Sequence, residues 1–309
     1  MSLQIKLLAT LTGHNAAIYA LTRFGDCYLT GGGEGFIAEW QPQKTRDARL
    51  VAQVPEAVFC LCFAENYLLA GTISGNLYVI DYAKKEILKN IVHHQKGIFS
   101  IFYIQKSNGN EVFKPELLTA GGDGRLTFWN TETWQPVETL RLAANALRCI
   151  AHQKSSNLIA VGDSQSNITI VDTFTKKILK TLKNAHKPSV FCVCFSPCGK
   201  FLFSGGRDAV LKIWRIDDDF CLEKSINAHN FSINDVQFSP NGALFATASR
   251  DKTIKIWNAE THELLKVLDL FRFGAHRNSV NRLAWQSDTE LLSVSDDRTV
   301  CLWSYELLF

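Results

Sequence analysis

The sequence predicts an all-β protein made of seven copies of one four-stranded antiparallel sheet, arranged in a closed ring. The clearest copy is the stretch from Ala228 to Asn258, AHNFSINDVQFSPNGALFATASRDKTIKIWN. Aligned on the residue that ends the third strand, copies recur every 40–49 residues, at Trp40, Ile80, Trp129, Val171, Trp214, Trp257 and Trp303. A four-stranded unit with a period of about 40–45 residues is typical of a β-propeller. One such sheet is too small to bury its own apolar faces, so neighbouring copies must cover them.

The clearest copy shows how the local residues specify each strand. Alternation of apolar and polar residues and clusters of turn residues place the strands at Ile233–Phe238, Leu244–Ala248, Thr253–Trp257 and, more weakly, Leu264–Leu268. The turn Ser239–Gly242 contains a Pro that presets one backbone dihedral and a Gly that accepts positive φ. A tight turn at Arg250–Lys252 separates the second strand from the third.

The two ends of the chain are predicted to meet in one sheet. The segment Ile5–Leu11 precedes His14 at the distance where other copies place their fourth strand, and the chain stops six residues after Trp303. The last copy therefore lacks a fourth strand of its own, and we expect Ile5–Leu11 to supply it. Closure removes the exposed edges of an open array. We interpret residues 1–309 as a single seven-bladed domain.

These repeats resemble the tryptophan–aspartate (WD40) repeat family, and the resemblance covers essentially the whole chain. The family's Gly-His pair stands here as Gly13-His14, with Ala185-His186, Ala228-His229 and Ala275-His276 as variants. The Trp-Asp pair is not intact in any copy, although Ile80-Asp81 and Val171-Asp172 keep the Asp without the Trp. The resemblance implies a propeller that binds partner proteins, without naming one.

Five copies share one set of polar residues. An acid lies six positions before each Trp, a Ser or Thr lies four further back, and a His precedes the copy. The sets are His14, Thr30, Glu34 and Trp40; His94, Thr119, Asp123 and Trp129; His186, Ser204, Asp208 and Trp214; His229, Thr247, Asp251 and Trp257; and His276, Ser293, Asp297 and Trp303. The two copies without Trp have Ala70 and Ser74, or Val161 and Gln165, at these positions and lack the His. Joint presence and joint absence indicate a mutually dependent hydrogen-bond network.

A Ser–His–Asp group also permits a catalytic interpretation. A nucleophilic triad needs one exposed hydroxyl beside an oxyanion hole, whereas five copies tied to strands and turns favour a structural role. The resemblance implies that the acid holds the His, the His contacts the hydroxyl, and the hydroxyl contacts the indole. Glu34 is one methylene longer than Asp, so the first set departs most from the pattern.

The tight turns and the connections between copies are expected on one face of the ring, where we predict the binding surface. The residue five positions after each His, its equivalents elsewhere, and residues just before the turn acid should lie near this rim: Tyr19, Phe59, Phe99, Arg148, Phe191, Arg207, Asn234, Arg250, Asn281 and Asp296. Such rim positions commonly contact partners in the WD40 family. Aromatic and Arg anchors favour a protein or peptide with an acidic or phosphorylated segment beside an apolar anchor. In the alternative interpretation, Phe59, Phe99 and Phe191 pack between blades.

Composition limits the other functions. A net charge of +3 does not indicate a nucleic-acid or membrane surface, and no apolar run approaches the roughly 20 residues of a membrane span. The N-terminus lacks the apolar core of a signal peptide, so we expect a cytoplasmic protein. The nine cysteines include Cys60/Cys62 and Cys192/Cys194 but no paired C-x₂-C motifs. We therefore expect buried thiols with no metal and no cofactor.

The predicted function is a non-catalytic protein-interaction scaffold, with the propeller itself monomeric inside a larger assembly. Two alternatives remain: an adaptor or substrate-recognition subunit, such as that of a ubiquitin ligase, and an enzyme with an active site in the central channel. The W-D-x-R box of some ligase adaptors is absent, since the fifth copy reads Trp214-Arg215-Ile216-Asp217. No nucleophile elbow or phosphate loop is present.

Two irregularities are also visible. The turn Gln105–Glu116, QKSNGNEVFKPE, is longer than its equivalents and is interpreted as an exposed insertion. The segment Phe271–Gly274, FRFG, is similar to the FRRG signature of phosphoinositide-binding propellers but lacks the second arginine. We interpret it as the approach to His276.

Overall fold

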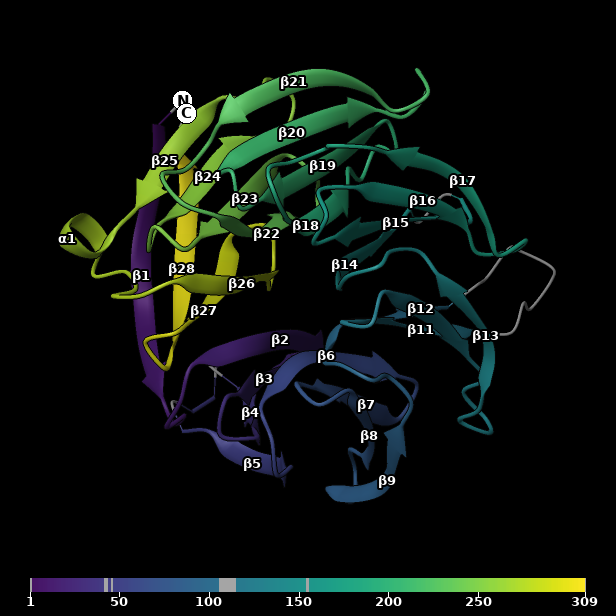
Figure 1. Cartoon of the computed structure of the whole chain (residues 1–309). Helices are drawn as coiled ribbons and strands as arrows, with labels where there is room; N and C mark the ends of the chain where they lie inside the picture. Colours follow the sequence, from purple (N-terminus) through teal and green to yellow (C-terminus); the bar gives the residue numbers. More distant parts are fainter. Residues whose placement is uncertain (1, 42–43, 46, 106–114, 154–155, 309) are drawn as a thin grey trace, which may run out of the picture.

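The protein is a ring of seven four-stranded antiparallel sheets, here called blades 1 to 7 (Figure 1). The structure is a computed structural model and describes residues 2–41, 44–45, 47–105, 115–153 and 156–308. The loop expected at Gln105–Glu116 lies largely outside the described residues, because 106–114 are not among them. No helix in the described part of the chain has the length and hydropathy of a membrane span.

The strands follow one another in chain order within each blade. Blade 1 contains β2 (Ile18–Phe24), β3 (Cys27–Gly32), β4 (Phe36–Trp40) and β5 (Arg49–Gln53), and blade 2 contains β6 (Val58–Ala64), β7 (Tyr67–Thr72), β8 (Asn76–Asp81) and β9 (Glu86–Val92). Blade 3 contains β10 (Ile98–Ile104), β11 (Glu116–Gly121), β12 (Arg125–Trp129) and β13 (Pro136–Arg141), and blade 4 contains β14 (Leu147–His152), β15 (Leu158–Asp163), β16 (Ile168–Asp172) and β17 (Lys177–Leu182). Blade 5 contains β18 (Val190–Phe195), β19 (Phe201–Gly206), β20 (Val210–Arg215) and β21 (Cys221–Asn227), and blade 6 contains β22 (Ile233–Phe238), β23 (Leu244–Ser249), β24 (Ile254–Asn258) and β25 (Leu264–Leu268). Blade 7 contains β26 (Val280–Trp285), β27 (Glu290–Ser295), β28 (Thr299–Leu308) and β1 (Ser2–Thr12).

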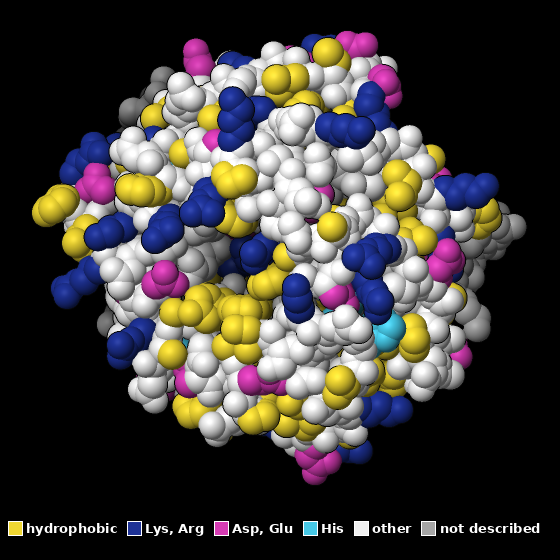
Figure 2. All heavy atoms as spheres, in the orientation of Figure 1, with side chains coloured by type: hydrophobic (Ala, Val, Ile, Leu, Met, Phe, Trp, Pro, Cys, Tyr) yellow, Lys and Arg dark blue, Asp and Glu magenta, His cyan; other side chains and the backbone are white. Residues whose placement is uncertain are grey.

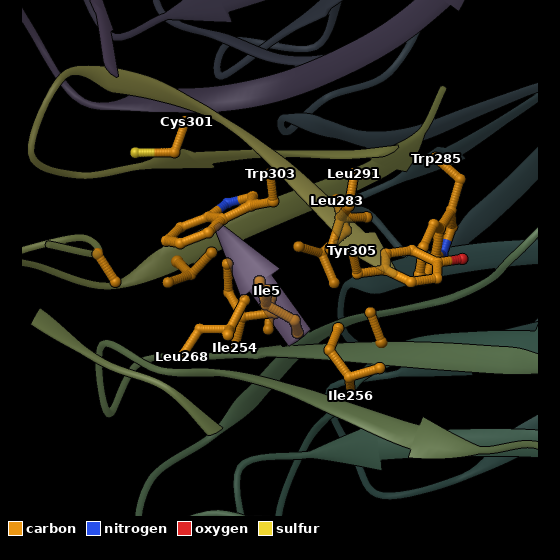
Figure 3. Packing of buried hydrophobic residues seen from close by; sticks show 14 of the residues in the cluster. Ile5, Ile254, Ile256, Leu268, Leu283, Trp285, Leu291, Cys301, Trp303 and Tyr305 are labelled. Carbon is orange, nitrogen blue, oxygen red and sulfur yellow. The ribbon is translucent and has the colours of Figure 1, made fainter. Parts of the chain in front are cut away.

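Closure of the ring depends on both ends of the chain. Strand β1 pairs antiparallel with β28, with Ile5 opposite Tyr305 and Leu7 opposite Trp303. The N-terminal strand therefore occupies the outer position of blade 7, which is consistent with the expected closure. In Figure 3, Ile5 lies near Trp303 of its own blade and Leu268 of blade 6, so it also fills an interface between blades.

The hydrophobic core is divided among the seven interfaces between consecutive blades. Seven buried clusters are present among the described residues, and each combines side chains from two neighbouring blades. The first strand of each blade lies next to the first strands of its neighbours, around the centre, while outer strands such as β9 are mostly exposed (Figure 1). Each blade thus buries its apolar faces against two others, as the repeat required.

A β-bulge recurs in the first strand of every blade. The pairing with the second strand skips one residue at the same place each time: Tyr19, Phe59, Phe99, Arg148, Phe191, Asn234 and Asn281. A bulge leaves one residue unpaired and changes the direction of its side chain. These seven residues are the rim positions that the sequence aligned across the seven copies.

A single-turn helix, α1 (Leu270–Phe273), interrupts the connection from blade 6 to blade 7. The side chain of Asp269 accepts a hydrogen bond from the backbone N–H of Arg272, and Gly274 ends the turn with a φ of 68°. The FRFG segment is therefore a capped helical turn rather than a plain approach to His276.

Candidate functional site

The five polar sets form five hydrogen-bond networks with the same geometry. In each, His Nδ1 lies 2.5–3.2 Å from the turn acid and His Nε2 lies 2.7–2.8 Å from the Ser or Thr hydroxyl. The Trp Nε1–H donates to the same hydroxyl over 2.7–3.0 Å. The acid also accepts the backbone N–H of the residue after the His. Each network joins the connection, the second strand, the turn and the third strand of one blade.

The first network differs from the others because Glu34 has a longer side chain than Asp. Oε1 of Glu34 accepts both the His14 and the Asn15 bonds, while its Oε2 is buried with no hydrogen-bond partner. In the network of blade 3, Asp123 divides the equivalent bonds between its two oxygens. The extra methylene of Glu34 therefore leaves one carboxylate oxygen without a bond.

Burial and the neighbouring carboxylates set the protonation of the networks. Burial lowers the pKa of His14, His94 and His229 despite their acid partners. A neutral imidazole can donate from Nδ1 to the acid and accept the hydroxyl proton at Nε2. At His276, burial again opposes the charge, but the interactions with Asp297 and Cys301 outweigh it and raise the pKa to about 9.

Blades 2 and 4 lack the His, and blade 2 joins the same segments by other means. In blade 2, Glu56 accepts a hydrogen bond from the backbone of Ser74 and another from the side chain of Asn76. These bonds hold the pKa of Glu56 below its usual range, although its partial burial acts in the opposite direction. In blade 4, Asp163 bonds only within its own turn, to Gln165 and Asn167. Sequence alignment on the His missed Glu56, because it lies on the connection rather than in the turn.

The face that carries the tight turns and the connections, here called the turn face, has a hollow at the centre of the ring. The hollow has a volume of about 370 Å³. Its lining consists of Tyr19, Phe59, Phe99, Arg148, Phe191, Ser232, Asn234, Arg250, Ser279, Asn281, Arg282 and Asp296. Nine of the ten predicted rim residues are in this lining, and all seven bulge residues are among them. The tenth, Arg207, is exposed and lies outside the lining.

The bulge residues of blades 1 to 3 form a row of aromatic rings, here called the aromatic row, and the bulge residue of blade 4 continues it. Tyr19 packs edge-on against Phe59 at 5.2 Å between ring centroids, and Phe59 stacks on Phe99 at 5.4 Å. The guanidinium of Arg148 lies 4.3 Å from the centre of the Phe99 ring. Each of the three predicted Phe residues is half-buried and also lines the hollow. The contact between Phe59 and Phe99 also crosses a blade boundary. The rings are thus placed both to pack between blades and to face the hollow, which are the two interpretations given above.

On the opposite side of the hollow, the bulge asparagines bond to the next blade. Asn234 Nδ2 donates to the carbonyl of Val280, and Asn281 Nδ2 donates to the carbonyl of Ile18 and to Asp296. These amides are therefore committed to joining blades 6, 7 and 1. The aromatic rings and the guanidinium groups of the lining remain available to contact a ligand.

A second cavity of about 340 Å³, here called the shaft, adjoins the hollow and is lined by residues of the inner strands. Its walls include the thiols of Cys60, Cys62, Cys149 and Cys192. Burial raises the pKa of Cys62 and Cys149 to about 12, which leaves them as thiols at neutral pH and poor nucleophiles. Among the described residues, no group of three or more His, Cys, Asp or Glu side chains is arranged to hold a metal ion.

Sequence reasoning missed Arg282, which lines both the hollow and the shaft. It directly follows the bulge residue Asn281 and occupies the position of Cys60 and Cys149 in their blades. The signal was available, because aligning the copies one position further would have shown the only arginine at that place.

Comparisons with known proteins agree with this architecture. Residues 176–215, 220–258 and 268–304 match the family described as WD domain, G-beta repeat. The chain is 23% identical to echinoderm microtubule-associated protein-like 1 of Mus musculus over 67% of this chain and 25% of that protein. It is 27% identical to the ribosome biogenesis protein YTM1 of Pyricularia oryzae over 68% of this chain and 42% of that protein. It is also 31% identical to the DDB1- and CUL4-associated factor 11 homolog of Caenorhabditis elegans, over 29% of this chain and 17% of that protein.

The matched repeats correspond to blades 5, 6 and 7 in space. The chain spans about a quarter of the length of its microtubule-associated relatives. The other four blades have the same strand order. Blades 1 and 3 carry the same type of network, and blade 2 carries its Glu56 counterpart. The chain therefore contains WD40 repeats, and it forms a seven-bladed β-propeller.

Proposed function

We propose that this chain is a non-catalytic interaction platform that binds a protein or peptide at the hollow on the turn face. The observation that carries the proposal is the convergence of one bulge residue from every blade on a single hollow. Bulges that aim side chains at one place are typical of functional positions on a sheet. The lining combines aromatic rings with arginines, the residue types that most often anchor interfaces.

The chemistry of the lining supports a partner with an acidic or phosphorylated segment beside an apolar anchor. Arg148, Arg250 and Arg282 line the hollow, whereas Asp296 is the one acidic side chain in that described lining. Arg207 adds a positive charge on the same face outside the hollow. The aromatic row from Tyr19 to Phe99 supplies the apolar surface.

The printed names of the relatives support assembly with other proteins. One relative is called a DDB1- and CUL4-associated factor homolog, and this favours adaptor duty in a ubiquitin ligase as the second candidate. In either case, the proposal has the propeller as one monomeric subunit of a larger assembly. We include a cytoplasmic location, supported by nine cysteines that are all free.

Affinity capture from a native lysate tests the platform. The double variant Arg207→Glu, Arg250→Glu should lose the proteins that the wild type captures, because two exposed positive charges on the turn face become negative. Its thermal midpoint should stay that of the wild type, since both side chains are exposed. Unchanged capture by the folded double variant would contradict binding on this face.

A further inference from the structure

The hollow and the shaft adjoin at four shared side chains, here called the neck. Phe99, Arg148, Phe191 and Arg282 line both cavities, so they stand where one passes into the other. They come from blades 3, 4, 5 and 7, and the two arginines therefore approach the axis from well-separated blades. In Figure 2 the centre of the ring is hollowed, with Lys or Arg side chains inside it and hydrophobic side chains beside it.

Arg148 has hydrogen-bonding capacity that the protein does not use. Its Nε is buried and has no hydrogen-bond partner among the described residues, and its guanidinium rests on the Phe99 ring. Burial lowers the pKa of Arg148, which reflects the cost of holding this charge away from water. A buried donor without an acceptor is unfavourable, and a charge-assisted bond to an incoming anion would remove that cost.

Arg282 forms no close ion pair in the described part of the chain, although its charge acts on the nearby carboxyl of Asp235. Its Nη1 donates to the backbone carbonyls of Asn234 and Asn281. The nearby carboxyl of Asp235 already accepts three bonds, from the Val236 and Leu283 backbone N–H groups and the Gln237 amide. The neck therefore presents two arginines, of which Arg148 has an unused donor and Arg282 is only partly compensated, through its electrostatic interaction with Asp235.

We propose that the neck binds the carboxylate of a Glu or Asp side chain that a peptide partner inserts end-on from the turn face, an inference that rests on the proposed function. The carboxylate accepts from Arg148 Nε–H and from Arg282, and the aliphatic stem of the inserted residue passes between Phe99 and Phe191. The adjacent peptide residue packs on Tyr19 and Phe59. A singly charged group fits better than a phosphate, because Asp235 in the shaft wall already interacts with the charge of Arg282 and so leaves less positive charge to be balanced.

NMR of the ¹⁵N-arginine-labelled full chain reports this contact directly through the Nε–H resonance of Arg148. The resonance is assigned as the one that is lost in the variant Arg148→Lys. We expect the amide of N-acetylglutamate to shift this resonance saturably, and the amide of N-acetylglutamine to leave it unchanged. The amide of N-acetylphosphoserine should bind more weakly than the glutamate compound. Tighter binding of the phosphoserine compound would overturn the carboxylate assignment, and no shift with any of the three would overturn the neck as an anion site.

A phage-displayed library of random 12-residue peptides, selected on the wild-type chain, separates this inference from the proposed function. Selected peptides should share an acidic position, and changing that residue to its amide should weaken binding about 10- to 100-fold, as should Arg148→Gln. Arg277→Gln removes one exposed charge from the same face outside the lining and should leave the affinity unchanged. Peptides that bind the hollow without an acidic position would overturn the neck inference and leave the platform standing. If no selected peptide competes with captured protein, the result counts against the platform and the neck inference together. In that case the resonance experiment decides whether the neck binds an anion.

Discussion

Blade 6 and blade 2 fasten the same two segments by opposite chemistry. In blade 6 an imidazole on the connection, His229, meets a carboxylate in the turn, Asp251, at 2.9 Å. In blade 2 a carboxylate on the connection, Glu56, accepts bonds from the turn residues Ser74 and Asn76. The fold thus requires a bond between connection and turn but does not require histidine for it.

A backbone bond common to all seven blades supports this conclusion. The residue before the turn acid, or its equivalent, donates its N–H to a carbonyl of the preceding connection in every blade: Gly33 to Ala17, Ile73 to Ala57, Gly122 to Gly97, Ser164 to Ala146, Arg207 to Ser189, Arg250 to Ser232 and Asp296 to Ser279. The side-chain networks reinforce this bond in five blades, and Glu56 reinforces it in blade 2. This supports a structural role for the networks, and our proposal assigns the aromatic and arginine bulge residues of the same face to binding.

The largest effect is expected from removing residues 1–12, which deletes the outer strand of blade 7. Its network at His276 would remain, so this truncation tests whether a network can replace a strand. We expect it cannot, because β28 would expose an unpaired edge and the cluster around Ile5 would open. Size-exclusion chromatography and thermal unfolding should show aggregation or loss of the folded state. A soluble monomer with an unchanged melting temperature would contradict this expectation.

A smaller effect is expected from Thr247→Val in blade 6. The substitution keeps the shape but leaves His229 Nε2 and the Trp257 indole N–H without a partner. Two buried orphaned groups should cost about 2–4 kcal/mol in the free energy of unfolding, measured by urea denaturation. The mirror variant Val161→Thr in blade 4 adds a buried hydroxyl where neither His nor Trp is present, and should destabilise by about 1–3 kcal/mol. A stabilising Val161→Thr would mean that hydroxyl, His and Trp are not mutually dependent.

The pH dependence of stability should distinguish blade 7 from blade 6, and its effect is smaller still. The pKa of His276 is raised from 6.5 to about 9, so its proton stabilises the folded state below pH 6.5, and this contribution is lost as pH rises towards 9. The contribution amounts to roughly 2–3 kcal/mol. The pKa of His229 is lowered, so its contribution instead falls as the pH drops below 6.5.

Urea unfolding of the wild type and of His276→Gln at pH 6.5 and pH 9 measures this difference. The variant should be less stable at both values but should lose less stability between them. Parallel losses in the two proteins would show that His276 does not carry the proton.

The repeat pattern was enough to predict most of the fold. Strands β22 and β25 begin and end where the sequence placed them, and β24 begins one residue later than expected. Hydrophobic alternation and turn residues are local signals that place the strands. The period and the number of the copies predict that the sheets close into a ring. The five networks could be predicted because hydroxyl, acid and Trp recur at fixed spacings and a His precedes each set.

The parts of the site that the sequence did not predict depend on contacts between blades. The position of Arg282 at the neck and the unpaired Nε of Arg148 depend on side chains from blades that are distant in the sequence. The exclusion of Arg207 from the hollow depends on the direction of an exposed side chain. The Glu56 bond was missed because it reverses the order of acid and partner along the chain.

The central claim is that this face separates residues that hold the blades from residues that bind a partner. Its most direct test measures, side by side, the melting temperature and the dissociation constant for a selected peptide in Thr247→Val and in Arg148→Gln. The account predicts a lower melting temperature with unchanged affinity for Thr247→Val, and weaker binding with a nearly unchanged melting temperature for Arg148→Gln. Loss of affinity in Thr247→Val at a temperature where it is fully folded, or full affinity in Arg148→Gln, would contradict it.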